Sequence, residues 1–364
     1  MRTVIRYIFI LMNVVPVLLL LATAVVRLFY HEPPWIFELL SLGYPYYLAI
    51  NVAFLLFWLI MKKFWYALVL FCVMALTYPL FFDTFAFGSE REIKEEDQTL
   101  TILTYNVKAF NHWGWRERAT VQGEIFALVK QVQPDIICFQ EYHHDRQEKF
   151  QFMDSVQQQL GLHYEVEHRV HSIEERYFYG PVIFSRYPIV RSGRLDFGNS
   201  GNVSMWADIV RNGDTVRVYN NHLESYRLQP LDFETMEQVA DGENVEMEEV
   251  QNVLQKITSA MRKRSIQSLL LSASLRECPY KTLVCGDFNA PPYSFTYHII
   301  RGNNNLRDAF LETSQGVGGT FHWRFVNKRI DFILTHPDVT PMSSQVLRFP
   351  FSDHYPVAAV VKVN

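Results

Sequence analysis

Hydrophobic residues fill three long stretches near the start of the chain, at about 5–29, 37–61 and 64–87, and charged side chains rarely interrupt them. Each stretch is long enough for an α-helix to cross the roughly 30 Å hydrocarbon core of a bilayer. The first is too long for a cleaved signal peptide and has no small-residue cleavage site. The pattern therefore predicts a membrane module at residues 1–88 with three transmembrane helices.

The short loops between these stretches set the expected orientation. Arg2 and Arg6 lie at the start of the first stretch, and Lys62 and Lys63 separate the second from the third. Because basic loops stay in the cytoplasm, the N-terminus is expected there, and three spans would place the rest of the chain on the outer side. We therefore expect an integral protein of a bacterial-type inner membrane or a plasma membrane, with an extracytoplasmic soluble domain.

After a polar linker at 89–99, the pattern changes to short apolar strands separated by helices. Strands are predicted at 100–105, 135–139, 164–170, 179–189, 205–210, 215–220, 283–285, 329–334 and 357–363. Helical spacing predicts helices at 120–131 and 150–160. Asn212 and Gly213 are typical of a tight hairpin turn between two of the strands. The soluble domain, 100–364, is thus expected to belong to the α/β class.

A further helical pattern, near 229–275, stands apart from this alternation and predicts an insert. Its first part, 229–255, contains eight acidic residues and no Lys or Arg, and Val250, Val253 and Ile257 fall at helical spacing. The ordinary explanation is a solvated surface helix with an acidic loop. The functional alternative is a lid or a partner-binding surface.

Composition limits the candidate partners. The formal net charge is −4, and the residues after Gly88 carry 29 basic and 35 acidic side chains, a net of −6. An acidic domain disfavours a long polyanion such as duplex DNA as the main ligand. The four cysteines, at positions 72, 138, 278 and 285, show neither the paired spacing of a zinc site nor a disulfide framework.

The stretch 282–290 carries the most informative local pattern. Leu283, Val284 and Cys285 predict a buried strand, and Asp287 and Asn289 follow it, two residues apart. Residues i and i+2 of an extended segment share a face, so the carboxylate and the amide should point the same way. Such oxygen ligands suit a hard divalent cation or a phosphate bound to one. Asp and Asn are also common turn residues, so this stretch alone leaves both explanations open.

Polar residues of metal-binding or acid/base type recur along the whole domain, at or near the ends of apolar strands. They are Asn106, Glu141, His222, Asp287, Asn289, Asp331, Asp353 and His354. Taken singly, each has an ordinary explanation as a helix cap, a turn residue or a surface histidine. A packed sheet gathers strand ends along one edge, so the series together predicts a single functional site.

Seven short motifs carry a family resemblance. In chain order they are Leu-Thr-Tyr-Asn-Val at 103–107, Cys-Phe-Gln-Glu at 138–141, Val-Ile-Phe-Ser-Arg-Tyr-Pro-Ile at 182–189, Asn-His-Leu at 221–223, Gly-Asp-Phe-Asn at 286–289, Arg-Ile-Asp-Phe-Ile-Leu at 329–334 and Ser-Asp-His at 352–354. The series resembles the endonuclease/exonuclease/phosphatase superfamily, which includes DNase I, abasic-site endonucleases, neutral sphingomyelinases and inositol polyphosphate 5-phosphatases. The membrane module lies outside the resemblance.

The resemblance implies a four-layered α/β sandwich, in which two packed, mainly antiparallel sheets are flanked by helices on both outer faces. It also implies hydrolysis of a phosphoester that depends on Mg²⁺, with Mn²⁺ as the alternative ion. Glu141 is then the principal metal ligand, with Asn106 beside it and Asp353 close by. Some relatives carry an acid two residues after the Asn106 position, where this chain has Lys108, which weakens the case for a second metal site.

Five further residues take catalytic roles by the same resemblance. Asp287 would activate or orient the attacking water, and Asn289 would hold a phosphate oxygen. His354 would contact the phosphate, with its ring oriented by Asp331. His222 would act on the phosphate or on the leaving oxygen. These residue types fit the chemistry, since carboxylates hold Mg²⁺ and imidazoles supply proton transfer and charge stabilisation.

The sequence therefore favours a membrane-anchored, divalent-metal-dependent phosphodiesterase acting on a lipid headgroup or another small phosphoester. An extracytoplasmic nuclease is the alternative, and the basic and aromatic cluster Trp113, Trp115, Arg116 and Arg118 would serve it. A catalytically silent membrane scaffold is the third hypothesis, and the complete set of acids and imidazoles argues against it. The sequence indicates no protein partner.

Overall fold

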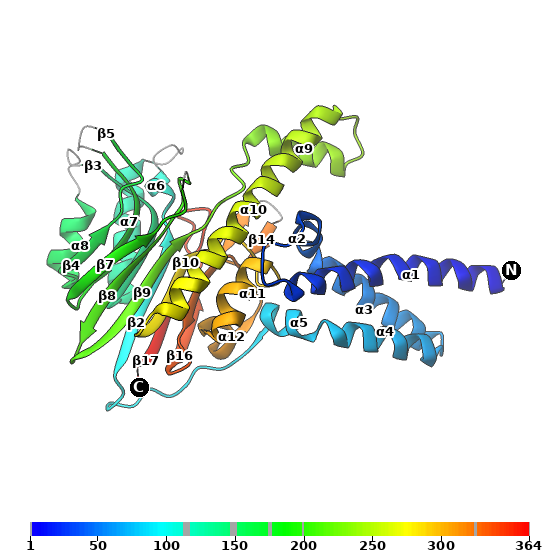
Figure 1. The fold of residues 1–364 in the computed structure, drawn as a ribbon, viewed down its shortest axis with the longest axis horizontal. Helices are drawn as coiled ribbons and strands as arrows, with labels where there is room; N and C mark the ends of the chain where they lie inside the picture. The colour runs from blue at the N-terminus through cyan, green and yellow to red at the C-terminus, as the bar shows by residue number, and fades with distance from the viewer. Residues whose placement is uncertain are drawn as a thin grey trace. The chain divides into compact units, whose positions relative to one another are not determined.

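A computed structural model describes residues 2–111, 117–145, 151–173, 177–198, 200–323 and 326–363 (Figure 1). The chain forms two compact units, each built from segments that are far apart in the sequence. The helical unit comprises residues 1–84, 226–266 and 292–298, and the sheet unit comprises 85–225, 267–291 and 299–364. Every candidate site residue belongs to the sheet unit.

The apolar N-terminal region contains five helices in its described part, where the sequence predicted three, the second with tolerated irregularities at Gly43 and Pro45. They are α1 (Arg2–Val25), α2 (Trp35–Ser41), α3 (Tyr44–Ile60), α4 (Phe64–Leu76) and α5 (Tyr78–Thr84). Tyr7–Leu28 is long and apolar enough to cross a membrane. Helices α2 and α3 meet at a bend of 59°, and α4 and α5 meet at a bend of 62°. Each pair is long enough to cross a membrane only if its two helices are counted as one span. Pro45 and Pro79 follow the two bends, at the second helical position, where a missing N–H costs no helical hydrogen bond.

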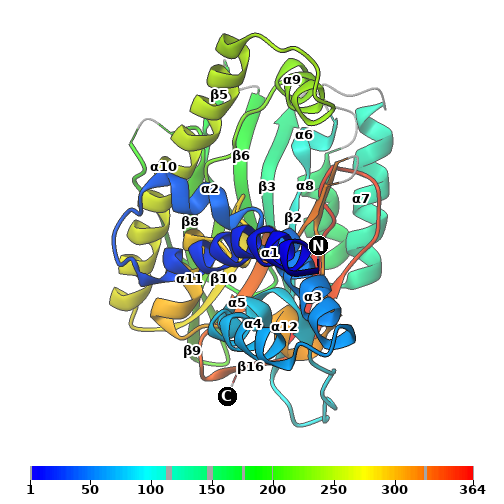
Figure 2. The same cartoon turned by 90° about the vertical axis from the view of Figure 1, so that its right-hand side faces the viewer.

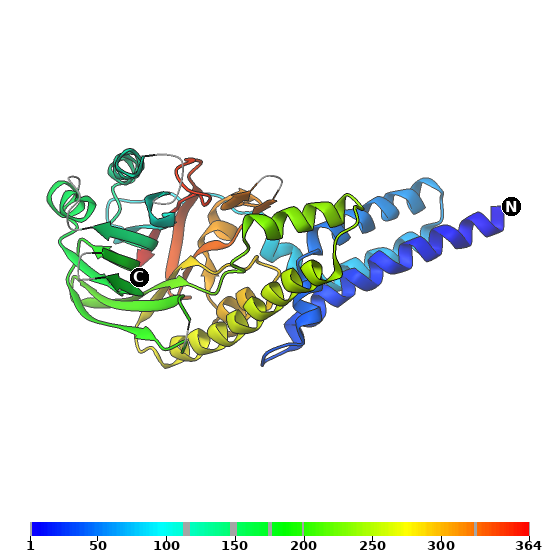
Figure 3. The ribbon, with the colours of Figure 1, turned by 90° about the horizontal axis from the view of Figure 1, so that it is seen from above.

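Helices α1, α3 and α4 pack alongside one another (Figure 3). Trp58 of α3 is buried among apolar neighbours, and its indole N–H donates to Asn13 Oδ1 at 3.2 Å. Asn51 Nδ2 donates to the Pro16 carbonyl at 2.9 Å. Leu18 and Phe71, in contrast, are exposed on the outer surface of the helices. Polar contacts inside and apolar side chains outside are typical of helices that pack within lipid.

The predicted insert forms two helices, α9 (Pro230–Ala240) and α10 (Met247–Glu277). Gln229 and Asp232 form a capping box at the start of α9, and Lys256 of α10 pairs with Asp232 at 2.7 Å. Within the helical unit, Arg262 of α10 pairs with Glu32 at 2.9 Å, at the loop between α1 and α2. The first part of the insert therefore packs with the N-terminal helices as one unit.

Two sheets form the core of the sheet unit. The six-stranded sheet has the order β11 (Arg307–Asp308), β15 (Asp331–Thr335), β10 (Lys281–Asp287), β9 (Asp214–His222), β8 (Val203–Arg211) and β7 (Ile189–Leu195). The seven-stranded sheet has the order β16 (Val339–Val346), β17 (Val357–Val363), β2 (Thr99–Asn106), β3 (Ile136–Asp145), β6 (Tyr177–Ser185) and β4 (Tyr164–Glu167), and β5 (His171–Ile173) also pairs with β6. Most described pairs are antiparallel, and β9–β10 and β2–β3 are parallel.

The remaining elements are short or lie outside the two sheets. They are β1 (Ala86–Phe87), β12 (Gln315–Gly316), β13 (Phe321–Trp323), β14 (Val326–Lys328), α6 (Lys108–Asn111), α7 (Arg118–Val132), α8 (Phe152–Leu160), α11 (Phe295–Arg301) and α12 (Ala309–Thr313), with 3₁₀ turns at Val26–Leu28 and Gly302–Asn304. β1 pairs with β12, and β13 pairs with β14.

The two sheets pack face to face, with helices outside them. Ile102 and Cys138 of one sheet and Val218 and Leu283 of the other share a single buried cluster. On the opposite face of the seven-stranded sheet, α7 and α8 pack over β2, β3 and β6 (Figure 2). On the opposite face of the six-stranded sheet, Tyr219 Oη lies 3.0 Å from Ser274 Oγ in the last part of α10. This arrangement confirms the predicted α/β sandwich of two sheets flanked by helices.

Most predicted strands and helices are present, with two corrections to strand ends. The hairpin turn has positive φ at Asn212 and Gly213, 53° and 89°, as a tight two-residue turn requires. β3 was expected to stop before Glu141, but it continues to Asp145. β15 begins at Asp331, which the prediction placed inside a strand, and all four cysteines are free thiols.

Candidate active site

Three candidate residues of the six-stranded sheet lie in one row across neighbouring strands. Asp287 ends β10, where it is in register with Asp331 of β15 on one side and with His222 of β9 on the other. Because β9 and β10 are parallel, their last residues meet at the same edge, and antiparallel β15 starts there. Strand register alone therefore gathers two carboxylates and an imidazole.

Gly286 allows β9 and β10 to approach closely beside this row. Its φ is +123°, and a Cβ added there would lie 2.0 Å from the Asn221 carbonyl oxygen. On the same strands, Asn221 Nδ2 donates to the Cys285 carbonyl at 2.8 Å. A side chain at position 286 would push β9 away, so the glycine keeps His222 next to Asp287.

Asn289 reaches the site through a turn. Its φ is +51°, its N–H donates to Asp287 Oδ1 at 2.8 Å, and its Nδ2 lies 3.2 Å from Asp287 Oδ2. The same Nδ2 donates to the Leu223 carbonyl at 2.9 Å. The sequence correctly placed the two side chains together, but the extended-strand reason for it was wrong. Asn289, with its positive φ, makes the turn. Phe288 lies between the two polar residues and packs on Phe332, with the ring centroids 4.8 Å apart.

The seven-stranded sheet supplies Asn106 and Glu141 by different local means. Asn106 is the last residue of β2. Glu141 lies inside β3 with φ +49°, at a register shift between Phe139 and Tyr142. Such a bulge re-aims a side chain while the strand continues beyond it. This is why Glu141 lies at the site although β3 does not end there.

The segment before β17 supplies the last two candidates. Ser352 Oγ donates to the Asn106 carbonyl at 2.9 Å and to Asp353 Oδ1 at 3.2 Å, which fixes this segment against β2. Asp353 Oδ2 lies 2.6 Å from Lys108 Nζ. Burial would raise the pKa of Asp353, but the charges of His354 and Lys108 outweigh it and lower the pKa.

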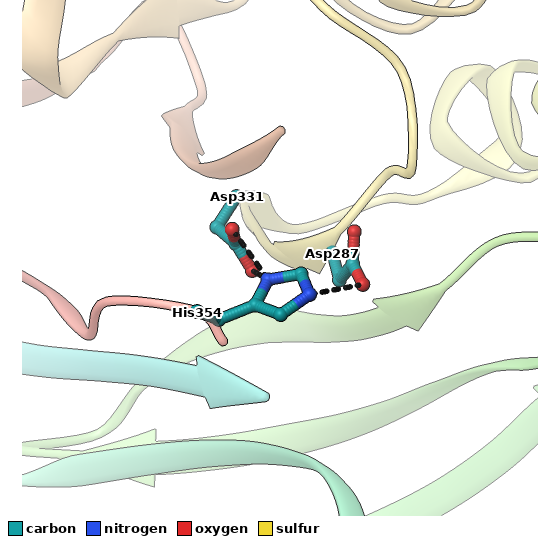
Figure 4. A group of neighbouring side chains, drawn as sticks. All are labelled: Asp287, Asp331 and His354. Carbon is teal, nitrogen blue, oxygen red and sulfur yellow. Dashed lines mark hydrogen bonds and ion pairs between the residues drawn. The ribbon is translucent and has the colours of Figure 1, made fainter. Parts of the chain in front are cut away.

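His354 lies between two carboxylates (Figure 4). Its Nδ1 is 2.9 Å from Asp331 Oδ2, and its Nε2 is 3.7 Å from Asp287 Oδ2. Burial would lower the pKa of His354, but the charges of Asp331 and Asp287 outweigh it and raise the pKa to about 10. The ring is therefore an imidazolium at neutral pH, with both nitrogens protonated.

Asp287 joins the two sheets at the centre of the site. Asn106 Nδ2 is 3.1 Å from Asp287 Oδ2 and 3.2 Å from Glu141 Oε1. His222 Nε2 lies 3.6 Å from Glu141 Oε1 and 3.9 Å from Asp287 Oδ2. Burial raises the pKa of Asp287 to about 6, against the opposing charge of His354. The structure thus brings the predicted residues of both sheets into one site.

Comparison with known families agrees with this geometry. The family model of the endonuclease/exonuclease/phosphatase family matches residues 103–354. The chain belongs to this family. A second family model, described as a domain of unknown function, matches residues 6–84. Among curated proteins, none matches the chain.

Solved structures of the family share the fold at low identity. An endonuclease/exonuclease/phosphatase from Bacteroides vulgatus is 18% identical, with a TM-score of 0.52 over 73% of this chain and 100% of that one. The human Nocturnin catalytic domain with bound sulfate is 18% identical, with a TM-score of 0.52 over 75% and 98%. A Bacteroides thetaiotaomicron mannosyl-6-phosphatase is 15% identical, with a TM-score of 0.50 over 72% and 99%. These likenesses show the fold and leave the substrate open.

Enzymes of the endonuclease/exonuclease/phosphatase family typically depend on a divalent metal, and the residues of this site fit one. Asp287, Asp331 and His354 place potential ligand atoms within 4.8 Å of one another. His354, however, is a cation whose two nitrogens face carboxylates, so it is a poor ligand. Glu141 is a better candidate, because its side chain is 23% exposed and lies beside Asn106, whose amide oxygen can also bind a hard cation.

Sequence reasoning missed a buried polar bridge beneath the site. Gln140 Nε2 donates to Asn220 Oδ1 at 2.7 Å, and Asn220 Nδ2 donates to the Phe139 and Val182 carbonyls at 2.9 Å. The bridge ties β9 to β3 and β6 of the other sheet. One signal was available, since these two polar residues interrupt apolar strands just before Glu141 and His222.

The basic and aromatic cluster proposed for nucleic-acid binding is described only at its edge. Trp113, Trp115 and Arg116 lie outside the described residues. Arg118 begins α7, and its Nη2 donates to the His143 carbonyl at 2.8 Å.

Proposed function

We propose that this family member is a membrane-anchored, Mg²⁺-dependent phosphodiesterase that acts outside the cytoplasm. The supporting observation is the His354 imidazolium, which Asp331 holds from one side while Asp287 faces its other nitrogen. A fixed cation beside an ionisable carboxylate can stabilise the charge that grows on a phosphoryl group during hydrolysis.

Glu141, Asn106 and Asp353 are the residues proposed to hold the metal ion. Carboxylate and amide oxygens are the ligands that Mg²⁺ prefers. Asn106 would present its amide oxygen to the ion after rotation of the amide group about the Cβ–Cγ bond, which exchanges Oδ1 and Nδ2. The bound ion would act as a Lewis acid on a phosphoryl oxygen.

The remaining residues are proposed to act on water and on the phosphoryl group. Asp287, with a pKa of about 6, is ionised at neutral pH and can orient the attacking water and accept its proton. Asn289 donates from Nδ2 to Asp287 at the longer distance of 3.2 Å, so a phosphate oxygen can replace that contact. His354 stabilises the equatorial oxygens, and His222 serves the leaving oxygen.

The proposed substrate class is a lipid headgroup or another small phosphodiester. Two observations support it: the net charge of −6 after Gly88, which disfavours duplex DNA, and the apolar N-terminal helix, which would keep the site near lipid. A substrate panel tests it with sphingomyelin, phosphoinositides, plasmid DNA and a chromogenic diester, each with and without Mg²⁺. We expect Mg²⁺-dependent hydrolysis of the chromogenic diester and of one lipid. Faster cleavage of plasmid DNA than of any lipid would favour the nuclease instead.

The proposed topology has three membrane spans, with each bent helix pair counting as one. Basic residues then place the N-terminus in the cytoplasm and the catalytic domain outside it. A reporter fused after Asn364 tests this. A phosphatase reporter that is active only outside the cytoplasm should work there, and activity of a cytoplasmic reporter alone would reverse the orientation.

A further inference from the structure

A cavity of about 370 Å³ lies in the helical unit, between the segment that follows α1 and the middle of α10. Glu32, Trp35 and Glu38 line one side of it, and Ser259 and Arg262 of α10 line the other. Its volume falls within the range of pockets that hold small ligands, roughly 300–1,000 Å³. The cavity shares no residue with the candidate active site, because all its lining residues belong to the helical unit.

Glu38 places a buried carboxyl group at this cavity. The residue is only 7% exposed, although it borders the cavity. Ser265 Oγ of α10 donates to Glu38 Oε1, and Arg264 attracts the charge of Glu38 whereas Glu32 repels it. A buried carboxylate is costly unless polar groups satisfy it, and a serine hydroxyl donates a single hydrogen bond. A cationic donor bound in the cavity would supply further hydrogen bonds to this carboxylate.

The cavity lies at the end of a helix that is long enough to cross a membrane. Glu32 follows the apolar helix Tyr7–Leu28 by four residues. Trp35 is 46% exposed, and an exposed tryptophan next to a span is typical of the headgroup region of a bilayer. Arg27 pairs with Asp83 at 2.5 Å, so the end of α5 lies at the same end of the helices. We therefore expect the cavity at the depth of lipid headgroups, on the side where the chain continues past α5.

The lining groups match a headgroup that carries both charges. Glu32 and Glu38 accept hydrogen bonds, and the Trp35 ring can lie against a cation. Arg262 pairs through Nε with Glu32 at 2.9 Å, and its side chain is 68% exposed, so its other N–H groups can reach a phosphate. A primary ammonium donates three hydrogen bonds, whereas a quaternary ammonium donates none. The two acids therefore favour a primary ammonium, and they disfavour a lipid whose headgroup is only anionic.

We propose that this cavity binds the headgroup of a phospholipid with a primary ammonium, which places the ammonium at Glu38 and the phosphate at Arg262. The bound lipid would join the segment after α1 to α10 and hold the insert against the membrane module. The inference needs the membrane anchoring proposed above, but not the phosphodiesterase activity. Binding makes and breaks no covalent bond.

Native mass spectrometry of the full chain in detergent tests the proposal, because it counts the lipids that remain bound. The protein is mixed with equal amounts of phosphatidylethanolamine, phosphatidylcholine and phosphatidylglycerol, and a chelator prevents metal-dependent hydrolysis. Wild type should retain one phosphatidylethanolamine, in preference to the other two lipids by about tenfold or more, since only this lipid donates hydrogen bonds from an ammonium. Equal retention of the three lipids would overturn the proposal, because it would indicate non-specific binding.

Variants of the lining residues locate the bound lipid. Glu38→Gln and Arg262→Met should each lower the affinity for phosphatidylethanolamine by about tenfold or more, the effect of losing a hydrogen bond to a charged group. Glu248→Gln and Lys263→Met are the matched controls, because both residues are exposed on α10 and neither lines the cavity. The controls should bind as wild type does. Wild-type affinity in the folded Glu38→Gln and Arg262→Met variants would overturn the proposal.

Filling the cavity gives a second test that keeps its charges in place. Ser259→Phe should abolish the preference for phosphatidylethanolamine, because the larger side chain occupies the space of the headgroup. A melting temperature measured for each protein identifies any variant that is not folded. A folded Ser259→Phe variant that retains the lipid as wild type does would contradict the proposed location.

One further variant separates this proposal from the proposed function. Glu141→Gln, in the candidate active site, should retain phosphatidylethanolamine as wild type does. Loss of the lipid in Glu141→Gln but not in Glu38→Gln would place the lipid in the active site and overturn this inference alone. A wild type that retains the lipid but hydrolyses no phosphoester would overturn the proposed function and support the lipid site.

Discussion

The two sheets contribute to the site in different ways. In the six-stranded sheet, Asp331, Asp287 and His222 lie in a row that strand register sets directly. In the seven-stranded sheet, Glu141 depends on a bulge in β3. One edge of the site therefore follows from the sheet itself, and the other depends on local departures from regular structure.

The two edges also differ in exposure. The side chains of Asp287 and Asp331 are each 1% exposed, whereas those of Glu141 and Asp353 are 23% and 28% exposed. Burial strengthens electrostatic interactions, which suits the charge and proton work proposed for the inner row. Partly exposed carboxylates suit metal binding, because the bound ion must keep coordination positions free for water and substrate. We propose that the buried carboxylates of the six-stranded sheet orient the attacking water and the ring of His354, which the segment before β17 supplies, and that the more exposed carboxylates hold the metal ion.

The largest effect should come from the metal-binding edge. Glu141→Gln keeps the shape of the side chain but removes its charge, so hydrolysis of the chromogenic diester should fall by about 10³-fold or more while the fold remains. Circular dichroism and the melting temperature report on the fold. Glu277→Gln, at an exposed end of α10, is the control and should keep the wild-type rate. A near-normal rate of Glu141→Gln at limiting Mg²⁺ would show that the metal lies elsewhere.

Asp331, from the buried row, and His354, from the segment before β17, should behave as a unit. His354→Ala should lower kcat by about 10²–10³-fold with little change in KM, since the interaction is made mainly in the transition state. Asp331→Asn should reproduce much of this loss, because Asp331 holds the ring at 2.9 Å. The double variant should be little slower than either single one. Independent, multiplying losses would show that the two side chains act separately.

A smaller effect should follow from breaking the bridge between the sheets. Leucine has a similar size, but Asn220→Leu removes the amide that accepts from Gln140 and donates to the buried Phe139 and Val182 carbonyls. The free energy of unfolding should fall by about 2 kcal/mol in urea titrations. Asn252→Leu, on the exposed surface of α10, is the control and should change it by about 0.5 kcal/mol or less. Equal stability of the two variants would mean that the bridge does not hold the sheets together.

The last effect expected is a difference in the pH dependence of stability, measured with a chelator present. The pKa of His354 is about 10 in the folded chain and 6.5 as its ordinary value, so its imidazolium stabilises the fold fully below about pH 6.5 and loses this effect as pH rises through 10. The pKa of Asp287 is raised from 3.8 to about 6, so its ionisation lowers the free energy of unfolding as pH rises from 3.8 to about 6. Asp331→Asn should flatten the decline above about pH 6.5. An unchanged decline in that variant would show that Asp331 does not hold the proton on His354.

The position of the buried row in the six-stranded sheet was predictable from sequence. The more exposed edge, which contains Glu141, was only partly predictable. Asp287 and His222 stand at the ends of apolar strands, and their pattern placed them at one sheet edge. Glu141 was expected to end its strand. The bulge that contains it could not be predicted, because a bulge depends on pairing with β6 and leaves no trace in the local sequence pattern. Lys108 was noted as a departure from some relatives, but its ion pair with Asp353 is a tertiary contact.

The N-terminal region shows the same limit. Hydrophobic length predicted three spans, and one helix of the described residues, Tyr7–Leu28, agrees with the first of them. Gly43 and Pro45 were expected to be irregularities that one span tolerates, and the bend before α5, next to Pro79, was not expected. Proline near the start of a helix is common in straight helices as well, so only the packing of the region decides where a bend forms.

The rate of hydrolysis of the chromogenic diester by the purified full chain, measured against free Mg²⁺ concentration, tests the central claim most directly. The claim is that the two edges together form a metal-dependent phosphodiesterase site. It predicts no measurable rate with a chelator, a rate that rises with Mg²⁺ and saturates, and recovery of the rate when Mg²⁺ replaces the chelator. A rate that is the same with the chelator and with Mg²⁺, or no hydrolysis at any Mg²⁺ concentration, would contradict it.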